Sequence, residues 1–128
     1  MPVKKQISIV LENRVGALSK VSLALAKKKV NILGLCVDDL RDFGLLRIVV
    51  DSPARARKVL NREKLTYSAT DVLAIELPNQ PGGLAKIALK LARKGINIDY
   101  MYACAAGDKA LGIFKVSETS KADRLLGK

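Results

Sequence analysis

Two short loops carry the residues best suited to binding a small molecule. The segments NRVGAL and NQPGGL each place an asparagine and one or two glycines directly before a helical pattern. Free backbone N–H groups at a helix N-terminus attract a carboxylate, and glycine lets the backbone approach a ligand closely. The candidate ligand-binding residues are Asn79, Gln80, Pro81, Gly82, Gly83 and Leu84, and in the earlier loop Asn13, Arg14, Val15, Gly16, Ala17 and Leu18.

A ligand that also carries an ammonium group, such as an amino acid, needs hydrogen-bond acceptors as well. Asparagine side-chain oxygens and loop carbonyl groups can accept, and Asp99 is a further candidate acceptor in the second half of the chain. The QPGG stretch has fewer bulky side chains than the RVGA stretch. We therefore expect the loop at Asn79–Leu84 to be the main binding loop and the loop at Asn13–Leu18 to be secondary.

The same pattern also has a purely structural interpretation. Asparagine before a helix commonly caps the free N–H groups of the first turn, and glycine is common in such turns. Neither loop has the G-x-x-x-x-G-K-[ST] spacing of a phosphate loop, which argues against nucleotide binding. The binding interpretation gains weight because each loop precedes, at the same distance, an Asn-Ile pair, either Asn31-Ile32 or Asn97-Ile98.

The two loops belong to two copies of one unit. Gly16 and Gly82 are 66 residues apart, and this offset holds without a gap to the pair Leu60 and Leu126. A fixed offset over so long a span indicates internal duplication. We therefore expect two domains, residues 1–70 and residues 71–128.

Each copy predicts the order strand, helix, strand, strand, helix. The alternating first strand is followed by an apolar stripe with helical spacing, and the second helix opens with a cap residue, Ser52 or Thr119/Ser120. LTYSAT (65–70) supplies a fourth strand that only the first copy has, and residues 65–77 are expected to run as one nearly continuous extended segment that joins the two copies. The fold class is α+β, with two ferredoxin-like βαββαβ units in tandem, the second lacking its last strand. The predicted strands are 7–11, 30–37, 44–50, 72–77, 96–103 and 110–116, with first helices at about 16–29 and 82–95.

Composition gives no support for catalysis or metal binding. There is no histidine, which is the usual general base and metal ligand, and the two cysteines are too few for a structural zinc site. We predict no catalytic residue, no metal site and no cofactor, so the chain is not expected to be an enzyme. Cys36 and Cys104 are expected to be buried as small apolar side chains.

The net charge of +11 leaves a second class of function open. An excess of Lys and Arg is typical of proteins with anionic partners, but Lys20, Lys27 and Lys28 are expected on a solvated helix face. The sequence has neither an apolar run of about 18 residues nor a signal peptide. We therefore expect no membrane partner and a cytoplasmic location.

The duplicated βαββαβ pattern resembles the ACT domain, and in particular proteins built of two ACT domains in tandem. The resemblance rests on ENRVGALSKV, LPNQPGGLAKI, the VNI/GINI pair and DFGLLRIVV, and it covers nearly the whole chain. It implies a regulatory protein that binds a free amino acid where two such domains meet. The first loop of each unit and the Asn-Ile pair would line that site.

The chain has no room for a catalytic domain of its own. The resemblance therefore implies a protein that acts alone or through a partner such as a metabolic enzyme. We expect a homodimer, since the missing fourth strand would expose the edge of VLAIEL (72–77). Two alternatives remain open. One is a basic nucleic-acid-binding module, which is disfavoured because the first strands lack the aromatic residues that stack on RNA bases; the other is a pure assembly module.

Overall fold

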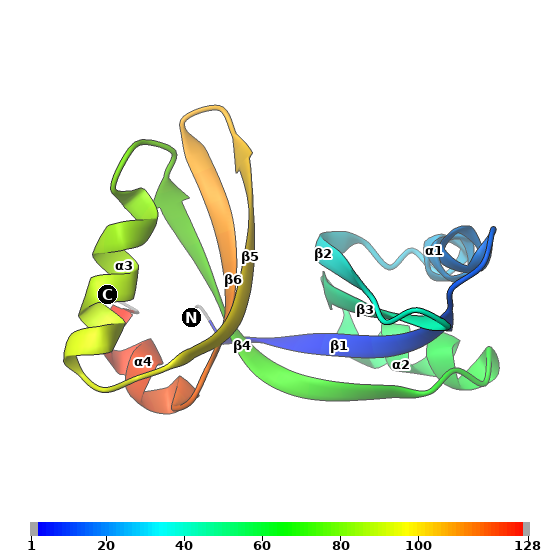
Figure 1. Cartoon of the computed structure of the whole chain (residues 1–128). Coiled ribbons are helices and arrows are strands. Elements are labelled where there is room, and N and C mark those ends of the chain that lie inside the picture. The colour runs from blue at the N-terminus through cyan, green and yellow to red at the C-terminus, as the bar shows by residue number, and fades with distance from the viewer. Residues whose placement is uncertain (1–2, 127–128) are drawn as a thin grey trace. The chain divides into compact units, whose positions relative to one another are not determined.

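The structure, a computed structural model, describes residues 3–126 and divides into two compact units (Figure 1). The first unit comprises residues 5–70. The second comprises residues 71–126 together with Val3 and Lys4. Residues 1–2 and 127–128 of the two expected domains lie outside the described residues. Both units have the predicted element order, with helices on one face of an antiparallel sheet.

In the first unit, β3 is the antiparallel neighbour of both β1 and β2. Cross-strand pairs such as Ile9 with Leu46 and Leu35 with Ile48 set the register. Leu25 of α1 and Leu60 of α2 close the core from the helical side. The elements of this unit are β1 (Val3–Glu12), α1 (Ala17–Lys27), β2 (Ile32–Asp39), β3 (Phe43–Val50), α2 (Pro53–Arg62) and the start of β4 (Tyr67–Pro78).

The second unit repeats this arrangement, with β6 between β4 and β5. Leu73 on β4 lies opposite Phe114 on β6, and both are fully buried in a core that Leu91 and Ala122 complete from the helices. The further elements are α3 (Gly83–Arg93), β5 (Ile98–Ala106), β6 (Lys109–Val116) and α4 (Thr119–Leu126).

The segment that joins the two copies is one strand. LTYSAT and VLAIEL, expected to run on without a break, both contribute to the 12-residue β4. Within residues 3–126 no strand follows α4, so the second unit lacks its last strand, as predicted.

The edge of β4 is less open than we expected. The strand order is β2-β3-β1-β4-β6-β5, so β1 is the second neighbour of β4. Val3, at the start of β1, packs against the core of the second unit. The expected free edge is therefore wrong where β1 lies beside β4.

Two helix boundaries follow the predicted signals. The Ser52 side chain accepts a hydrogen bond from the Arg55 N–H at 3.4 Å and so caps α2. Gly95 follows α3 with φ 70°, the left-handed conformation that ends many helices.

The prediction that both cysteines are buried is wrong. Cys104 is exposed and Cys36 is half-buried. Partial burial raises the pKa of the Cys36 thiol, and the nearby Arg47 opposes this rise. In the described part of the chain no group of three or more Cys, Asp or Glu residues is placed to hold a metal ion, and no helix there is long and apolar enough to cross a membrane.

Candidate functional site

The two glycine loops have the same backbone conformation. Gly16 and Gly82, directly before α1 and α3, have φ 88° and lie in the left-handed region that favours glycine. The Lys20 N–H donates to the Gly16 carbonyl at 3.0 Å, and the Lys86 N–H donates to the Gly82 carbonyl at 3.1 Å. Each helix therefore begins immediately after its glycine.

The first turn of each helix keeps two N–H groups without a hydrogen-bond acceptor among residues 3–126. They belong to Leu18 and Ser19 in α1 and to Leu84 and Ala85 in α3. Such groups carry the positive end of the helix dipole and favour a carboxylate. The predicted donors for a carboxylate are thus present in both loops.

The loop asparagines do not cap the helices, so that part of the sequence-based interpretation is wrong. The Asn13 side chain donates from Nδ2 to the Arg41 carbonyl at 2.7 Å and to Asp39 Oδ1 at 3.1 Å. The Asn79 side chain donates in the same way to the Gly107 carbonyl at 2.8 Å. Each asparagine instead ties its loop to the turn between the next two strands of its unit.

Backbone hydrogen bonds strengthen these ties. The Asn13 N–H donates to the Asp42 carbonyl at 3.2 Å, and the Asn79 N–H donates to the Asp108 carbonyl at 2.9 Å. Within the described chain no donor is bonded to the Oδ1 atom of either asparagine, which leaves an oxygen that can accept from a ligand ammonium group. The loops therefore hold both kinds of group that an amino acid requires.

The two glycines of the second loop have different roles. A Cβ atom added to Gly82 would meet no heavy atom within 4 Å, so the space beside it is open. A Cβ atom added to Gly83 would lie 2.3 Å from the Pro78 carbonyl oxygen. Gly83 is therefore required for packing inside the protein, whereas Gly82 combines an unusual φ with an open approach.

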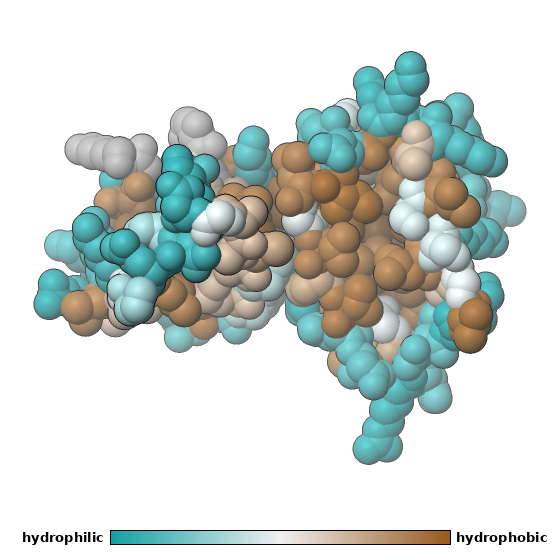
Figure 2. Space-filling view, turned by 90° about the horizontal axis from the view of Figure 1, so that it is seen from above, coloured by the Kyte–Doolittle hydropathy of each residue, from teal (hydrophilic) through white to brown (hydrophobic). Residues whose placement is uncertain are grey.

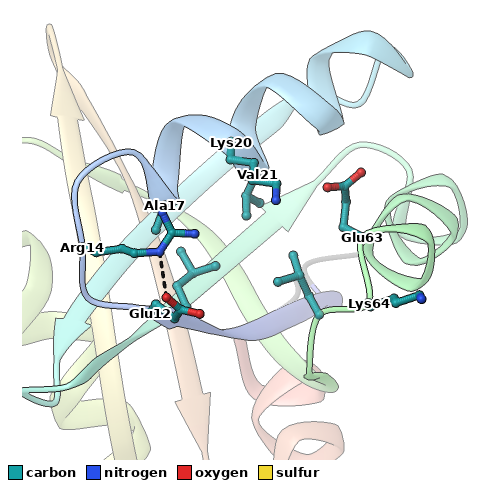
Figure 3. A pocket seen from close by; sticks show the side chains of 9 residues that line it. Glu12, Arg14, Ala17, Lys20, Val21, Glu63 and Lys64 are labelled. Atoms are coloured by element: carbon teal, nitrogen blue, oxygen red, sulfur yellow. Dashed lines mark hydrogen bonds and ion pairs between the residues drawn. The ribbon is translucent and has the colours of Figure 1, made fainter.

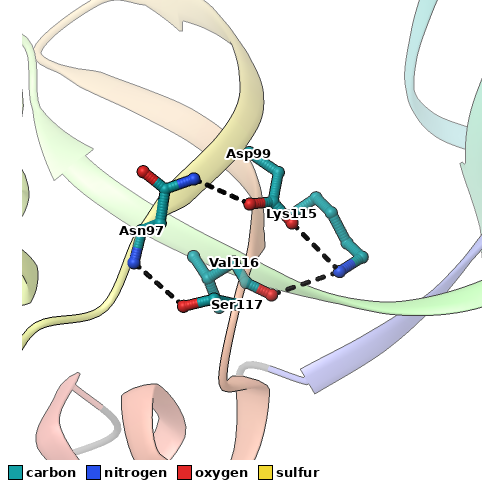
Figure 4. A network of polar contacts seen from close by, with 5 residues as sticks. All are labelled: Asn97, Asp99, Lys115, Val116 and Ser117. Carbon is teal, nitrogen blue, oxygen red and sulfur yellow. Dashed lines mark hydrogen bonds and ion pairs between the residues drawn. The ribbon is translucent and has the colours of Figure 1, made fainter.

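The Asn-Ile pairs are held in a different part of each unit. The Asn31 N–H donates to Asp51 Oδ1 at 2.9 Å, and the Asp51 N–H donates back to the Asn31 carbonyl at 3.0 Å. In the second unit the Asn97 N–H donates to Ser117 Oγ at 2.9 Å (Figure 4), and the Ser117 N–H donates back to the Asn97 carbonyl at 2.9 Å. Ile32 and Ile98 are the first residues of β2 and β5.

Asp99 is not a free acceptor for a ligand. Its carboxylate accepts from Asn97 Nδ2 at 2.8 Å and from Lys115 Nζ at 3.5 Å (Figure 4). The Lys115 ammonium group also donates to the Val116 carbonyl at 3.1 Å. Since its charge is already compensated inside the unit, Asp99 is a weaker candidate for binding ammonium than the sequence indicated.

Within one unit, the structure does not bring the glycine loop and the Asn-Ile pair together. In the second unit Asn79–Gly82 precede α3, whereas Asn97 and Ile98 follow it. An 11-residue helix such as α3 spans about 16 Å. One small ligand therefore cannot contact both segments of a single unit.

A cavity of about 260 Å³ adjoins the first glycine loop and lies between α1 and the end of α2 (Figure 3). On its wall Arg14 Nε donates to Glu12 Oε2 at 2.7 Å, so Arg14 is held beside the loop. The ENRVGALSKV motif includes Glu12, Arg14, Ala17 and Lys20. No motif included Glu63 or Lys64, because no local pattern connects α1 with the end of α2.

Each of the two ferredoxin-like units thus has a left-handed glycine directly before its first helix. Residues 1–126 match the family described as the ACT domain pair, so the chain belongs to that family. No curated protein matches the sequence.

Solved structures share the fold. The crystal structure of protein BT0572 from Bacteroides thetaiotaomicron has a TM-score of 0.93 and 39% identity over 98% of this chain and 88% of that chain. The ligand-free regulatory subunit of aspartate kinase from Thermus thermophilus has a TM-score of 0.73 and 16% identity, covering 99% and 92%. The regulatory subunit of aspartate kinase from Thermus flavus has a TM-score of 0.67 and 17% identity, covering 99% and 94%.

Proposed function

We propose that this ACT domain pair is a regulatory protein that senses a free amino acid. The single observation that carries the proposal is the duplicated loop, in which an asparagine with an oxygen that accepts no bond among the described residues precedes a helix whose first turn has unpaired N–H groups. The N–H groups suit the ligand carboxylate and the oxygen suits its ammonium group. Binding does not require a catalytic residue, a metal or a cofactor.

We propose further that the protein acts on a metabolic enzyme in the cytoplasm. The support is the similarity in fold to regulatory subunits of aspartate kinase, which are regulatory parts of an enzyme. Because these subunits are only 16% and 17% identical to this chain, the similarity extends to the fold alone. The regulated enzyme is therefore proposed only as a class, a metabolic enzyme whose pathway involves the sensed amino acid.

Each binding site would combine the glycine loop of one unit with the Asn-Ile pair of another. The support is the separation of about 16 Å between these segments inside one unit. The primary loop would be Asn79–Leu84, which has the open approach beside Gly82. The two ACT-like domains would be residues 1–70 and 71–128, with β4 joining them.

An exposed apolar surface on the first unit supports a homodimer. On the first unit, apolar side chains gather on the face shown at the right of Figure 2. Leu18 on α1 and Leu35 and Val37 on β2 are 46%, 47% and 49% exposed, next to a small apolar cavity floored by Leu25 and Ile48. Contiguous apolar surface of this kind is typical of protein–protein contacts, and a second copy of the chain would cover it.

A thermal-shift screen against the twenty amino acids tests the proposed function. A ligand at about 100 times its Kd stabilises the folded state by about 2.7 kcal/mol, which is easily detected as a rise in Tm. We expect at least one amino acid to raise the Tm. If none does at millimolar concentration, the chain is not an amino-acid sensor.

A further inference from the structure

A groove of about 450 Å³ runs between α1 and α2 of the first unit. Its floor is apolar and is formed by Leu23, Ala24 and Val59. Its walls carry four cationic side chains and one carboxylate, that of Glu63. The cationic residues are Lys20, Lys27, Lys28 and Arg62.

The positive charges of this groove are not compensated by the protein. None of the four cationic side chains forms an ion pair with any residue in the range 3–126, although Glu63 shares the groove with them. All four are exposed. Clustered like charges repel one another, and a partner of opposite charge relieves that repulsion and is steered toward it.

The exposed leucine on the floor of the groove favours one class of anionic partner over another. Leu23 is 64% exposed and lies between Lys20 and Lys27 on one stripe of α1. A phosphate backbone would neutralise the lysines but leave the leucine in contact with water. A helix with acidic residues beside an apolar stripe would cover both, as amphipathic helices do when they bind in grooves.

The pattern recurs on the second unit. Lys86, Leu89 and Arg93 occupy the equivalent positions on α3, and Leu89 is again half exposed, at 50%. A basic stripe with an exposed leucine in its middle is thus present on the first helix of both units. The groove adjoins the cavity beside the first glycine loop, since Lys20 and Glu63 line both, whereas Leu23, Lys27 and Arg62 line the groove alone.

We propose that the groove between α1 and α2 is a docking surface for an acidic amphipathic helix of a partner protein. This inference goes beyond amino-acid sensing and does not depend on it. In this proposal the partner protein contacts α1 and α2, whereas the glycine loops bind the ligand.

Fluorescence anisotropy with three labelled probes tests the proposal on the full chain. The first probe is a helical peptide with a leucine stripe flanked by glutamates, the second is the same peptide with glutamine in place of glutamate, and the third is a single-stranded RNA. We expect the acidic peptide to bind most tightly and to weaken as salt is raised, because salt screens exposed charges. Tighter binding of the RNA or of the glutamine peptide would overturn the proposal.

Matched variants locate the contact. The double substitution Lys27→Glu with Arg62→Glu should weaken acidic-peptide binding at least about tenfold, the scale expected when charge complementarity is reversed. The double substitution Arg57→Glu with Lys58→Glu makes the same change of charge on α2 outside the groove and should have a much smaller effect. Equal losses in the two variants would show a non-specific charge effect and contradict the proposal.

Leu23→Ser separates the apolar contact from charge. We expect it to weaken binding of the acidic peptide several-fold, about the effect of losing one buried leucine contact, with little change in stability because Leu23 is exposed. Unchanged affinity would contradict the amphipathic-helix assignment. Circular dichroism confirms folding, and the thermal shift with amino acids should be unaltered in every variant, so that failure of docking is distinguishable from failure of sensing.

Discussion

The side chain of Asn79 is bonded to the backbone of Gly107, with a distance of 2.8 Å between Nδ2 and the carbonyl oxygen. Asn13 makes the equivalent bond to Arg41 at 2.7 Å. Both acceptor residues have a positive φ, 67° for Gly107 and 74° for Arg41. The contact between the glycine loop and the following hairpin turn is therefore a duplicated feature of the unit, and it ties each loop to that turn.

Removing this tie should loosen the loop. We expect Asn79→Ala to lower the free energy of unfolding by about 1 kcal/mol, the usual contribution of one hydrogen bond, and to reduce the thermal shift produced by the amino-acid ligand. Urea denaturation and the thermal-shift assay measure the two effects. Lys90→Ala is the control, because the Lys90 side chain is exposed on α3 and lies outside the candidate loop; a similar loss in both variants would refute the role of Asn79.

Filling the space beside Gly82 should block the ligand. Valine is unsuitable for this test, because a β-branched residue is strained at φ 88°. Asparagine tolerates left-handed φ values, so we expect Gly82→Asn to remain folded and to lose binding at least about tenfold, the effect of about 1.4 kcal/mol. Gly95→Asn, at φ 70° with equally open space, is the control and should bind as the wild type does. Full binding by Gly82→Asn would show that the ligand does not approach this glycine.

Gly83 should matter for stability rather than for binding chemistry. An added methyl group would overlap the Pro78 carbonyl oxygen at 2.3 Å, and backbone shifts of this kind cost about 1–3 kcal/mol. We expect Gly83→Ala to lower the midpoint of urea denaturation accordingly. The reciprocal change Ala17→Gly in the first loop should cost at most about 1 kcal/mol; an equal or larger loss for Ala17→Gly would contradict this interpretation of the packing.

Much of the fold could be predicted from the sequence, because the internal duplication reveals the order of helices and strands. The offset that joins Gly16 to Gly82 fixed the element order, and the uninterrupted alternation through 65–77 predicted one long strand, which β4 confirms. The roles of Asn13 and Asn79 could not be predicted, because a local motif does not show that the partner lies 28 residues away in a hairpin turn. The involvement of Val3 with the second core likewise depends on a contact that is distant in the sequence.

The two thiols should differ in reactivity. Burial raises the pKa of Cys36, so a smaller fraction of it is the reactive thiolate at a given pH, whereas Cys104 is exposed. We expect iodoacetamide at pH 8 to label Cys104 several times faster than Cys36, and the rate at Cys36 to continue rising at higher pH. Mass spectrometry of Cys36→Ser and Cys104→Ser variants measures each site alone; faster labelling of Cys36 would contradict the observed burial.

The proposed dimer should depend on the apolar face of the first unit. Val37→Glu places a charge on the exposed end of β2, where it would be buried in a dimer and would cost several kcal/mol unless paired. We expect the wild type to elute with light-scattering mass near twice 13.8 kDa and the variant to elute as a monomer. A wild type that is monomeric at micromolar concentration would contradict the homodimer.

The most direct measurement is an NMR titration of the ¹⁵N-labelled protein with the amino acid that gives the largest thermal shift. We expect saturable changes in the backbone amide signals of Leu84 and Ala85, with accompanying changes at Asn97 or Asn31, because the proposed site combines a glycine loop with an Asn-Ile pair. Saturable changes confined to other parts of the chain, or no change at any loop amide for any amino acid, would contradict the assignment of these loops as an amino-acid-sensing site.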